Sequence, residues 1–273
     1  MKIYVPSRGR FEARFLDGIY SPLAWVTPKL ELVYVVSGNE YPMYRAALDK
    51  RRPETEVLPV GHPENLSQKR ATLAKMIAVR NESIFCMCDD DLSLYIRKSD
   101  DSFQLRYPEP DEVDDLFLNM IPELLEDYPM VGVGAREGNN RIGDGPRPLL
   151  TTCTRSMRLY AFRTKDYLSI DANRLPEMAD FDTTLQFLRR GQANAVINYY
   201  AQNQPQSQLK GGCSIYRTPA THDAVCRQLE ALHPGFVKLR QKANLGGGDY
   251  GTRTEVTISW KKAYEEGCAL RDL

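Results

Sequence analysis

A short apolar run that ends in three consecutive carboxylates limits what this chain can fold into more than any other stretch. Residues 84–88 read Ile-Phe-Cys-Met-Cys, and Asp89, Asp90 and Asp91 follow directly. A short apolar run that stops at charge predicts a buried strand with the acids at its carboxyl end. Side chains alternate along a strand, so we expect Asp89 and Asp91 on one face and Asp90 on the other. In an open α/β sheet, ligands bind beyond that end of the strands.

Three adjacent carboxylates repel one another unless a cation or basic side chains lie among them. A hard divalent ion accepts oxygen ligands, one or two from protein and the rest from phosphate and water. The alternative interpretation is an acidic turn in which Asp only caps the chain, because Asp is common in turns.

Apolar and amphipathic segments alternate along most of the chain, which predicts an α/β fold around a largely parallel sheet. The helix predicted at 111–127 is kinked or divided at Pro122. Further strands are expected at 2–6, 32–37, 57–60, 131–134, 158–162 and 195–200, and further helices at 41–50, 67–80, 180–190 and 222–232.

Two segments in the first third of the chain suit an anionic ligand. Ser7-Arg8-Gly9-Arg10 follows the first strand and offers backbone amides, a hydroxyl and two guanidiniums, which favours a phosphate or uracil cradle. An ordinary solvated turn is the alternative. In the helix at 67–80, whose expected N-cap is Ser67, Lys69 and Arg70 oppose the dipole of the first turn. A bound diphosphate would offset that cost.

Four stretches together resemble a known family. The strand that ends in Asp89-Asp90-Asp91 resembles the DxD site of GT-A glycosyltransferases, which hold Mn²⁺ or Mg²⁺ against a sugar-nucleotide diphosphate. Residues 3–10, the helix from Ser67, and residues 179–191 resemble, in the same order, the nucleotide loop, the helix before DxD and the Glu-Asp-x-Asp-Leu…Gly acceptor motif. The opening and the triple Asp are most similar to the TET-associated glycosyltransferases of phages, which glycosylate 5-hydroxymethyl-pyrimidines in DNA. The resemblance covers roughly residues 1–215.

The resemblance implies a GT-A-like, Rossmann-like α/β fold with a mostly parallel central sheet flanked by helices. The catalytic domain would span 1–215, with a donor half at about 1–100 and an acceptor half at about 101–215. Residues 216–273 would form a basic, Gly-rich C-terminal extension packed on the same domain. The implied activity is metal-dependent transfer of a sugar from a nucleotide-sugar, a UDP-sugar above all, to a hydroxyl such as that of 5-hydroxymethylcytosine in phage DNA.

The resemblance also implies roles for individual residues. Asp91 and Asp89 would bind Mn²⁺ or Mg²⁺, and His222 would complete the metal shell, although a lone histidine at a helix start also suits a structural role. Asp180 would be the catalytic base, with Asp182 as the second candidate; Ala179 stands where the motif has Glu. The expected donor contacts are Pro6, Ser7, Arg8, Arg10, Lys69, Arg70, Asp89 and Asp90.

Two basic stretches predict a nucleic-acid surface. Residues 136–174 are rich in arginine, whose planar fork suits phosphates and base edges, and residues 231–262 mix basic and aromatic side chains. The alternative is a basic surface that offsets the acidic helix at 111–127. The triple glycine at 246–248 predicts a hinge or lid. The expected DNA contacts are Arg141, Arg147, Arg155, Arg158, Lys238, Arg240 and Lys242.

Composition excludes little beyond a membrane protein. The formal net charge of zero gives no overall attraction to nucleic acid. With no apolar run of about 20 residues and no signal-like opening, we expect a cytoplasmic protein, in the host cytoplasm if phage-encoded. The six cysteines lack a C-x-x-C pair, and Cys86 and Cys88 are expected to pack as small apolar groups.

Two other functions stay open: transfer to a glycan or small molecule, and a catalytically silent nucleic-acid-binding module. The sequence leaves the oligomeric state undetermined.

Overall fold

The computed structural model describes residues 1–139, 148–205, 218–243 and 252–271. Arg141, Arg147 and the predicted glycine hinge at 246–248 lie outside these ranges. No helix within them is both long and apolar enough to cross a membrane.

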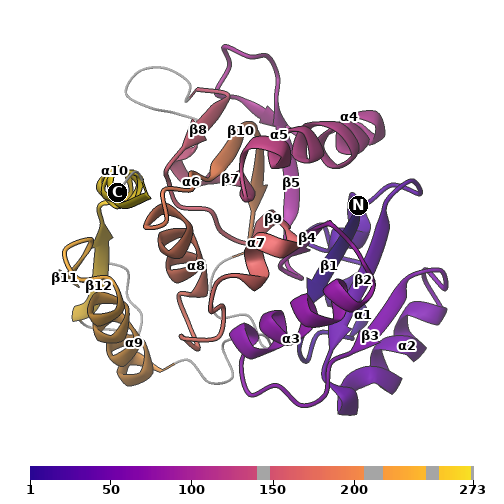
Figure 1. Cartoon of the computed structure of the whole chain (residues 1–273). Coiled ribbons are helices and arrows are strands. Elements are labelled where there is room, and N and C mark those ends of the chain that lie inside the picture. Colours follow the sequence, from indigo (N-terminus) through magenta and orange to yellow (C-terminus); the bar gives the residue numbers. More distant parts are fainter. Residues whose placement is uncertain (140–147, 206–217, 244–251, 272–273) are drawn as a thin grey trace.

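A ten-stranded sheet forms the centre of the described structure (Figure 1). Its strand order is β3-β2-β1-β4-β9-β7-β10-β5-β6, and β8 pairs with β10 off this path. The strands are β1 (Lys2–Pro6), β2 (Glu31–Val36), β3 (Glu56–Pro59), β4 (Ile84–Cys88), β5 (Ser93–Arg97), β6 (Leu105–Arg106), β7 (Met130–Ala135), β8 (Leu150–Thr152), β9 (Leu159–Arg163) and β10 (Ala195–Asn203).

Most of the sheet runs in one direction. Strands β1 to β3 are parallel to β4, and β7 and β10 share that direction because β9 lies antiparallel between β4 and β7. Strands β5, β8 and β9 run against them. The predicted mostly parallel α/β sheet is confirmed. The carboxyl ends of β1, β4, β7 and β10 therefore meet at one edge, which we call the carboxyl edge.

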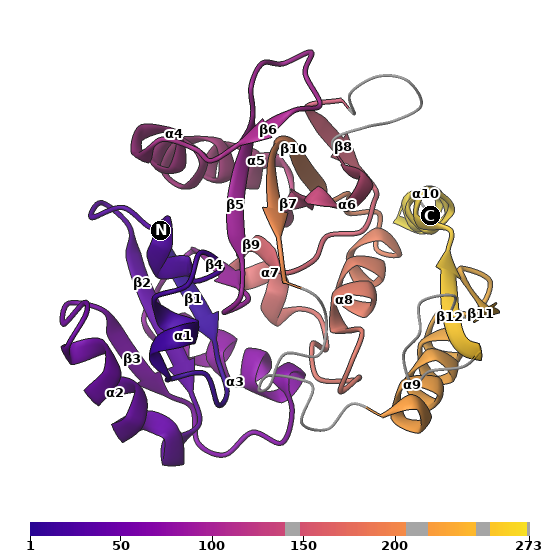
Figure 2. The same cartoon turned by 180° about the vertical axis from the view of Figure 1, so that it is seen from behind.

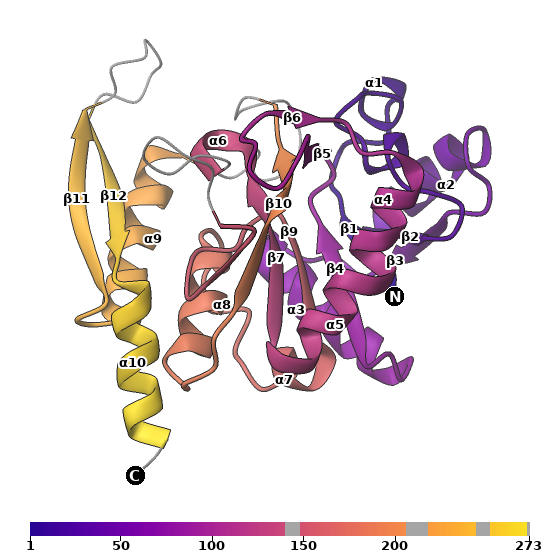
Figure 3. The ribbon, with the colours of Figure 1, turned by 90° about the horizontal axis from the view of Figure 1, so that it is seen from above.

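Helices cover both faces of the sheet (Figures 1 and 3). The predicted helix at 111–127 is divided near Pro122, which lies in the first turn of a segment that begins at Ile121. The chain passes through a π-helical turn at Leu116–Met120 just before it, and the wider turn accommodates a ring that cannot donate a backbone hydrogen bond. The helices are α1 (Ala13–Leu16), α2 (Tyr41–Asp49), α3 (Leu66–Val79), α4 (Pro110–Asp115), α5 (Ile121–Asp127), α6 (Arg136–Asn139), α7 (Thr164–Leu168), α8 (Ala179–Leu188), α9 (Pro219–Leu232) and α10 (Trp260–Arg271), with short 3₁₀ turns at Pro22–Ala24 and Gly38–Glu40.

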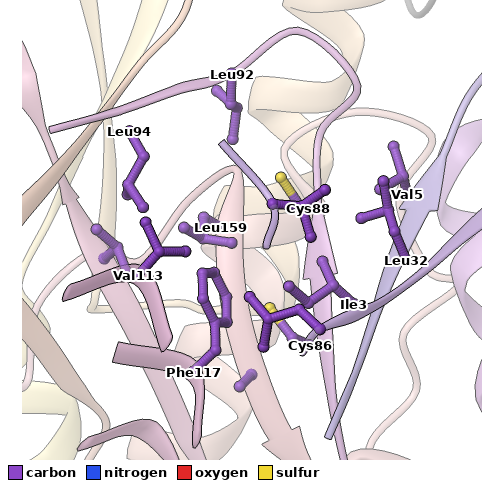
Figure 4. Close-up of a cluster of buried hydrophobic side chains, with 14 of the residues drawn as sticks. Ile3, Val5, Leu32, Cys86, Cys88, Leu92, Leu94, Val113, Phe117 and Leu159 are labelled. Atoms are coloured by element: carbon purple, nitrogen blue, oxygen red, sulfur yellow. The ribbon is translucent and has the colours of Figure 1, made fainter. Parts of the chain in front are cut away.

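Both faces of the sheet are buried, which explains the continuous apolar runs of its strands. Ile3 and Val5 pack with Cys86 and Cys88 on one face (Figure 4), and the alternate residues Tyr4, Phe85 and Met87 pack with Leu73 and Ile77 of α3 on the other. The two cysteines are buried free thiols, as predicted.

The C-terminal segments pack on α8. Helix α9, the antiparallel hairpin of β11 (Val237–Ala243) and β12 (Thr252–Ile258), and α10 share a third core cluster with α8 (Figure 2). Helices α10 and α8 come so close at Gly267 that a Cβ added to this glycine would lie 2.3 Å from the carbonyl oxygen of Leu188. The extension thus joins the rest of the protein through a tight helix–helix contact.

Candidate active site

Sheet register brings the first loop and the acid turn together. Strands β1 and β4 are parallel neighbours in which Tyr4 lies opposite Met87, so their continuations reach the carboxyl edge side by side. Strand β4 ends at Cys88, and Asp89 leads into a turn at Asp90 and Asp91, so we call residues 89–91 the acid turn. Gly9 has a φ of 68°, a left-handed conformation that glycine adopts without strain, and the chain folds back there.

Asp90 is buried against the first loop. It accepts hydrogen bonds from the Ser7 hydroxyl and from the Arg10 guanidinium. The Tyr44 hydroxyl of α2 shares a hydrogen bond of 2.6 Å with Ser7 Oγ and accepts one of 3.0 Å from the Arg10 amide. Glu40 fixes the same loop by accepting from the Gly9 amide at 2.7 Å.

Asp91 and Asp89 have different basic partners. Arg10 Nη1 lies 2.7 Å from Asp91 Oδ2, so one guanidinium serves both Asp90 and Asp91. Gln204, after β10, donates to Asp91 Oδ1 at 2.7 Å. Arg70 Nη2 donates to Asp89 Oδ1, also at 2.7 Å.

The expected alternation of the three acids is wrong, because alternation holds only within a strand and β4 ends at Cys88, before the first acid. In the turn, Asp90 and Asp91 converge on Arg10, while Asp89 points to Arg70.

The first turn of α3 completes the cluster. Lys69 Nζ donates to the Ser7 carbonyl oxygen at 2.5 Å, and Arg70 also lies over the Tyr160 ring. Ser67 is not the N-cap: Asn65 caps α3 by accepting from the Gln68 amide at 2.9 Å. The Ser67 hydroxyl is buried and donates to the Leu175 carbonyl instead.

Burial and charge act against each other in this cluster. Burial raises the pKa of Asp89 to about 6, although Arg70 lowers it in part. Burial also raises the pKa of Asp90, against the effect of Arg10. Burial alone would lower the pKa of Arg10, but the charges of Asp90 and Asp91 raise it overall. The three acids and the three bases Arg10, Lys69 and Arg70 therefore form one cluster with equal numbers of acidic and basic side chains, which we call the charge cluster.

Arg158 links the charge cluster to the rest of the carboxyl edge. Its carbonyl oxygen accepts a 2.8 Å hydrogen bond from the Asp89 amide, and its backbone is held at a φ of 66°. Such conformations are strained for a residue with a Cβ and often occur at functional sites. Its guanidinium lies 3.2 Å from Glu137 and 3.4 Å from Gln202.

The other predicted site residues are engaged elsewhere. Asp180, at the start of α8, accepts two hydrogen bonds from Arg155, at 2.9 and 2.8 Å. Asp182 is buried and contacts Arg174, Gln186 at 2.9 Å, and His233 at 2.7 Å. His222 Nδ1 of α9 lies 3.6 Å from the buried Glu177.

Within the described ranges, no group of three or more His, Cys, Asp or Glu side chains is arranged to hold a metal ion. The donor type nevertheless fits a hard divalent ion, because the turn supplies carboxylate oxygens. The Asp89 side chain is 24% exposed, whereas both oxygens of Asp91 already have partners in Arg10 and Gln204.

Most of the predicted DNA contacts within the described residues are paired with carboxylates. Arg155 pairs with Asp180 and lies 3.8 Å over the Phe181 ring. Arg240 and Lys242 of β11 lie 2.9 and 3.6 Å from Glu255 of β12. Lys238 is exposed on the same hairpin, and Arg8 is partly exposed and donates to the Glu64 carbonyl at 3.1 Å.

Sequence reasoning missed Tyr44, Glu40 and Gln204. Tyr44 sits in a predicted helix and Gln204 in a polar run, and no local pattern distinguishes either. Gln204 and Asp91 are 113 residues apart, and only the pairing of β10 with β5 brings them together.

A surface hollow of about 620 Å³ opens at the opposite edge of the sheet, between Ile84 at the start of β4, Leu125 and Thr164. None of the predicted site residues lines it.

The mostly parallel α/β sheet agrees with the GT-A-like fold that the sequence resemblance implies. The model of the TET-Associated Glycosyltransferase family matches residues 1–212, and the chain belongs to this family. It is therefore an enzyme of glycosyl transfer.

Three of the solved structures that resemble the chain are distant from it in sequence. A mycobacterial protein has 14% identity and a TM-score of 0.49, over 94% of this chain and 83% of its own. The 1–349 fragment of S. aureus TarS in complex with UDP has 14% identity and a TM-score of 0.44, over 85% and 65%. GalNAc-T7 with UDP, GalNAc and Mn²⁺ has 10% identity and a TM-score of 0.44, over 77% and 44%. No curated protein sequence matches the chain.

Proposed function

We propose that this enzyme transfers a sugar from a nucleotide-sugar, a UDP-sugar above all, to the hydroxymethyl group of a 5-hydroxymethyl-pyrimidine in DNA. The observation that carries the proposal is the charge cluster, in which the first loop, the first turn of α3 and the acid turn meet at the carboxyl edge. The membership of residues 1–212 in the TET-associated glycosyltransferase family supports it.

The bases of the charge cluster would bind the donor diphosphate. Arg10 and Arg70 end in planar guanidiniums that suit two phosphate oxygens at once, and Lys69 adds a third charge. All three now contact oxygens of the protein. Diphosphate oxygens are equivalent partners, so the donor would replace Asp91 on Arg10 at little electrostatic cost.

Asp91 and Asp89 would hold a divalent cation, Mn²⁺ or Mg²⁺, once Arg10 has turned to the diphosphate. When bound, the ion would neutralise charge on the leaving nucleotide diphosphate. Asp90 would stay with Ser7 and keep the first loop in place. The resemblance alone suggests His222 as a further ligand; in the structure it lies 3.6 Å from Glu177.

Asp180 is the better of the two candidate bases. A hydroxyl acceptor needs a base within hydrogen-bond reach. The Asp180 side chain is 17% exposed and has Arg155 as its partner, which an incoming DNA phosphate could draw away. The Asp182 side chain is 3% exposed and enclosed by Arg174, Gln186 and His233, which suits a structural role.

The test is transfer from a panel of sugar nucleotides to duplex and single-stranded DNA with 5-hydroxymethylcytosine, 5-hydroxymethyluracil or unmodified pyrimidines, each with Mn²⁺ and with EDTA. We expect product only with a hydroxymethyl base and a divalent cation. Faster transfer to glycans or to free hydroxymethyl nucleosides than to DNA would overturn the DNA acceptor. Full activity in EDTA would overturn the metal.

A further inference from the structure

Two tyrosines and an arginine form an aromatic surface beside the charge cluster. Tyr95 of β5 and Tyr107, directly after β6, stack with ring centroids 4.8 Å apart and an interplanar angle of 26°. The Arg136 guanidinium carbon lies 4.7 Å from the Tyr95 ring centroid, and Nη1 donates to the Tyr95 hydroxyl at 3.3 Å. We call Tyr95, Tyr107 and Arg136 the tyrosine platform.

One ring of the tyrosine platform is buried, and its other two side chains are exposed to solvent. Tyr95 is 7% exposed, whereas Tyr107 is 56% exposed and Arg136 is also exposed. A ring stacked on a second ring presents a flat apolar face to solvent, and such a face gains free energy when another planar group covers it.

The platform is held in place before any ligand arrives. Tyr95 lies opposite Ala201 of β10 in the antiparallel pairing. Arg106 donates to the Tyr107 carbonyl at 3.1 Å and is itself fixed by Glu112 at 2.7 and 2.5 Å. Little side-chain entropy would be lost on binding, so the stacking energy would appear largely as affinity.

The position of the platform is set by the same sheet edge as the charge cluster. Ala201, opposite Tyr95, also pairs with Gly134 of β7, and Arg136 follows Gly134 by two residues. Tyr95 is four residues beyond Asp91, a separation of at most about 14 Å for an extended chain.

The charges around the platform suit an anionic strand. Within the described residues, the ion pairs of this region join Arg106 to Glu112 and Arg158 to Glu137, and none uses Arg136. The Tyr95 hydroxyl donates to the Tyr107 hydroxyl at 3.3 Å, so the polar tips of the rings already contact each other. A sugar ring needs hydrogen-bond partners for its hydroxyls, whereas a nucleobase needs only the ring face and a cation for its phosphate.

We propose that the tyrosine platform binds one unpaired nucleobase of the acceptor strand by stacking on Tyr107, with Arg136 on the adjoining phosphate. The inference rests on the proposed function, because it assumes a DNA acceptor. Enzymes that modify a base act on single strands or turn the base out of the duplex, and an aromatic face then replaces the lost stacking.

The experiment compares two fluorescein-labelled strands by anisotropy: one wholly abasic, the other identical except for a single 5-hydroxymethylcytosine. We expect wild type to bind the base-bearing strand about tenfold more tightly, the scale of one stacked base. Tyr107→Ala should bind both strands equally, and Tyr107→Phe should keep the preference. Tyr41→Ala removes another exposed tyrosine, on α2 at the far side of the sheet (Figure 2), and should also keep it. UDP affinity and the urea unfolding midpoint should match wild type in all three variants.

The outcomes separate this inference from the proposed function. A preference that persists in Tyr107→Ala, or is absent from wild type, overturns the platform even if the enzyme glycosylates DNA. A preference that is lost only in Tyr107→Ala upholds the platform even if no sugar reaches DNA, and the proposed function alone then fails.

Discussion

At the scale of single residues, Arg10 has the largest structural role in the charge cluster, because one buried guanidinium serves two buried carboxylates. Asp90 and Asp91 would otherwise be adjacent buried anions, each with one neutral partner, Ser7 or Gln204. A charge left alone in the interior costs several kcal/mol. Arg10 is therefore both a proposed donor contact and a structural cation.

Arg10→Met should lower the free energy of unfolding by about 3–5 kcal/mol, the range for a buried ion pair that loses one partner. Urea unfolding at neutral pH measures this. Arg51→Ala, which breaks the surface pair with Asp17 at 2.5 Å, should leave stability almost unchanged. If the two variants unfold at the same urea concentration, Arg10 does not stabilise the acid turn.

Asp91→Asn should reduce transfer by at least about a hundredfold, the scale of one lost charge-stabilising contact at a transition state. The fold should persist, because Arg10 keeps its contact with Asp90. Calorimetric titration of Mn²⁺ in the presence of UDP should show weakened metal binding in this variant and unchanged binding in Asp17→Asn. Full transfer by Asp91→Asn would rule out the metal site.

Asp180→Asn should abolish turnover and leave nucleotide-sugar affinity nearly unchanged, since a base acts on the acceptor and not on the donor. Steady-state kinetics and UDP binding separate the two effects. Asp182→Asn should mainly destabilise the fold, because it disturbs the contacts with Arg174 and His233. A stable Asp182→Asn enzyme that binds donor without turnover would reverse the two roles.

At the scale of elements, sequence patterns predict what is local. The apolar runs of β1, β2 and β4 and the spacing in α3 and α8 are visible in the sequence and are confirmed. The sequence does not predict strand β5, because nothing in the residue pattern separates this strand from the acid turn. The β11–β12 hairpin was missed because its alternating basic and polar residues indicate a charged surface as readily as a strand.

For the candidate site too, the sequence predicts the local residue types but not the contacts between distant segments. The residue types at 7–10, 69–70 and 89–91 indicate a charged ligand, and the structure brings them together. Which acid pairs with which arginine depends on where β4 ends and on side chains up to 113 residues away. The prediction that Asp89 and Asp91 share a face is wrong, because β4 ends at Cys88 and strand alternation does not continue through the acids.

Gly267→Ala tests the element contact that joins the C-terminal extension to α8. The added Cβ would lie 2.3 Å from the Leu188 oxygen and 2.6 Å from the Gly191 nitrogen, so α10 must shift. Overpacking of this kind costs about 1–3 kcal/mol, which thermal unfolding would detect. Leu270→Ala, at a side chain exposed on α10, should unfold like wild type. Equal melting temperatures would show that α10 contributes little to the fold.

At the scale of the whole molecule, zero net charge hides an uneven distribution in which many basic side chains are already paired. Arg155 pairs with Asp180, Arg158 with Glu137, and Arg240 and Lys242 with Glu255. Of the acids of α4, Asp111 and Asp114 lie near Lys29, and Glu112 pairs with Arg106. Binding of DNA would therefore exchange internal ion pairs for phosphate contacts at several places, and its net strength should depend strongly on salt.

DNA affinity should fall with salt by a log–log slope of about −0.9 for each phosphate neutralised on duplex. Arg141 and Arg147 lie outside the described residues, in the arginine-rich stretch that predicts a DNA contact. Reversing both charges, Arg141→Glu with Arg147→Glu, should flatten the slope by about one or two units, while UDP affinity stays that of wild type. Lys50→Glu with Lys75→Glu makes the same change in net charge at exposed positions, one directly after α2 and one on α3, and should leave the slope unaltered. Fluorescence anisotropy between low and physiological salt gives all three slopes.

Equal flattening in both double variants would mean that overall charge, and not a local contact at 141–147, governs binding. A slope near zero in wild type would remove DNA as the acceptor.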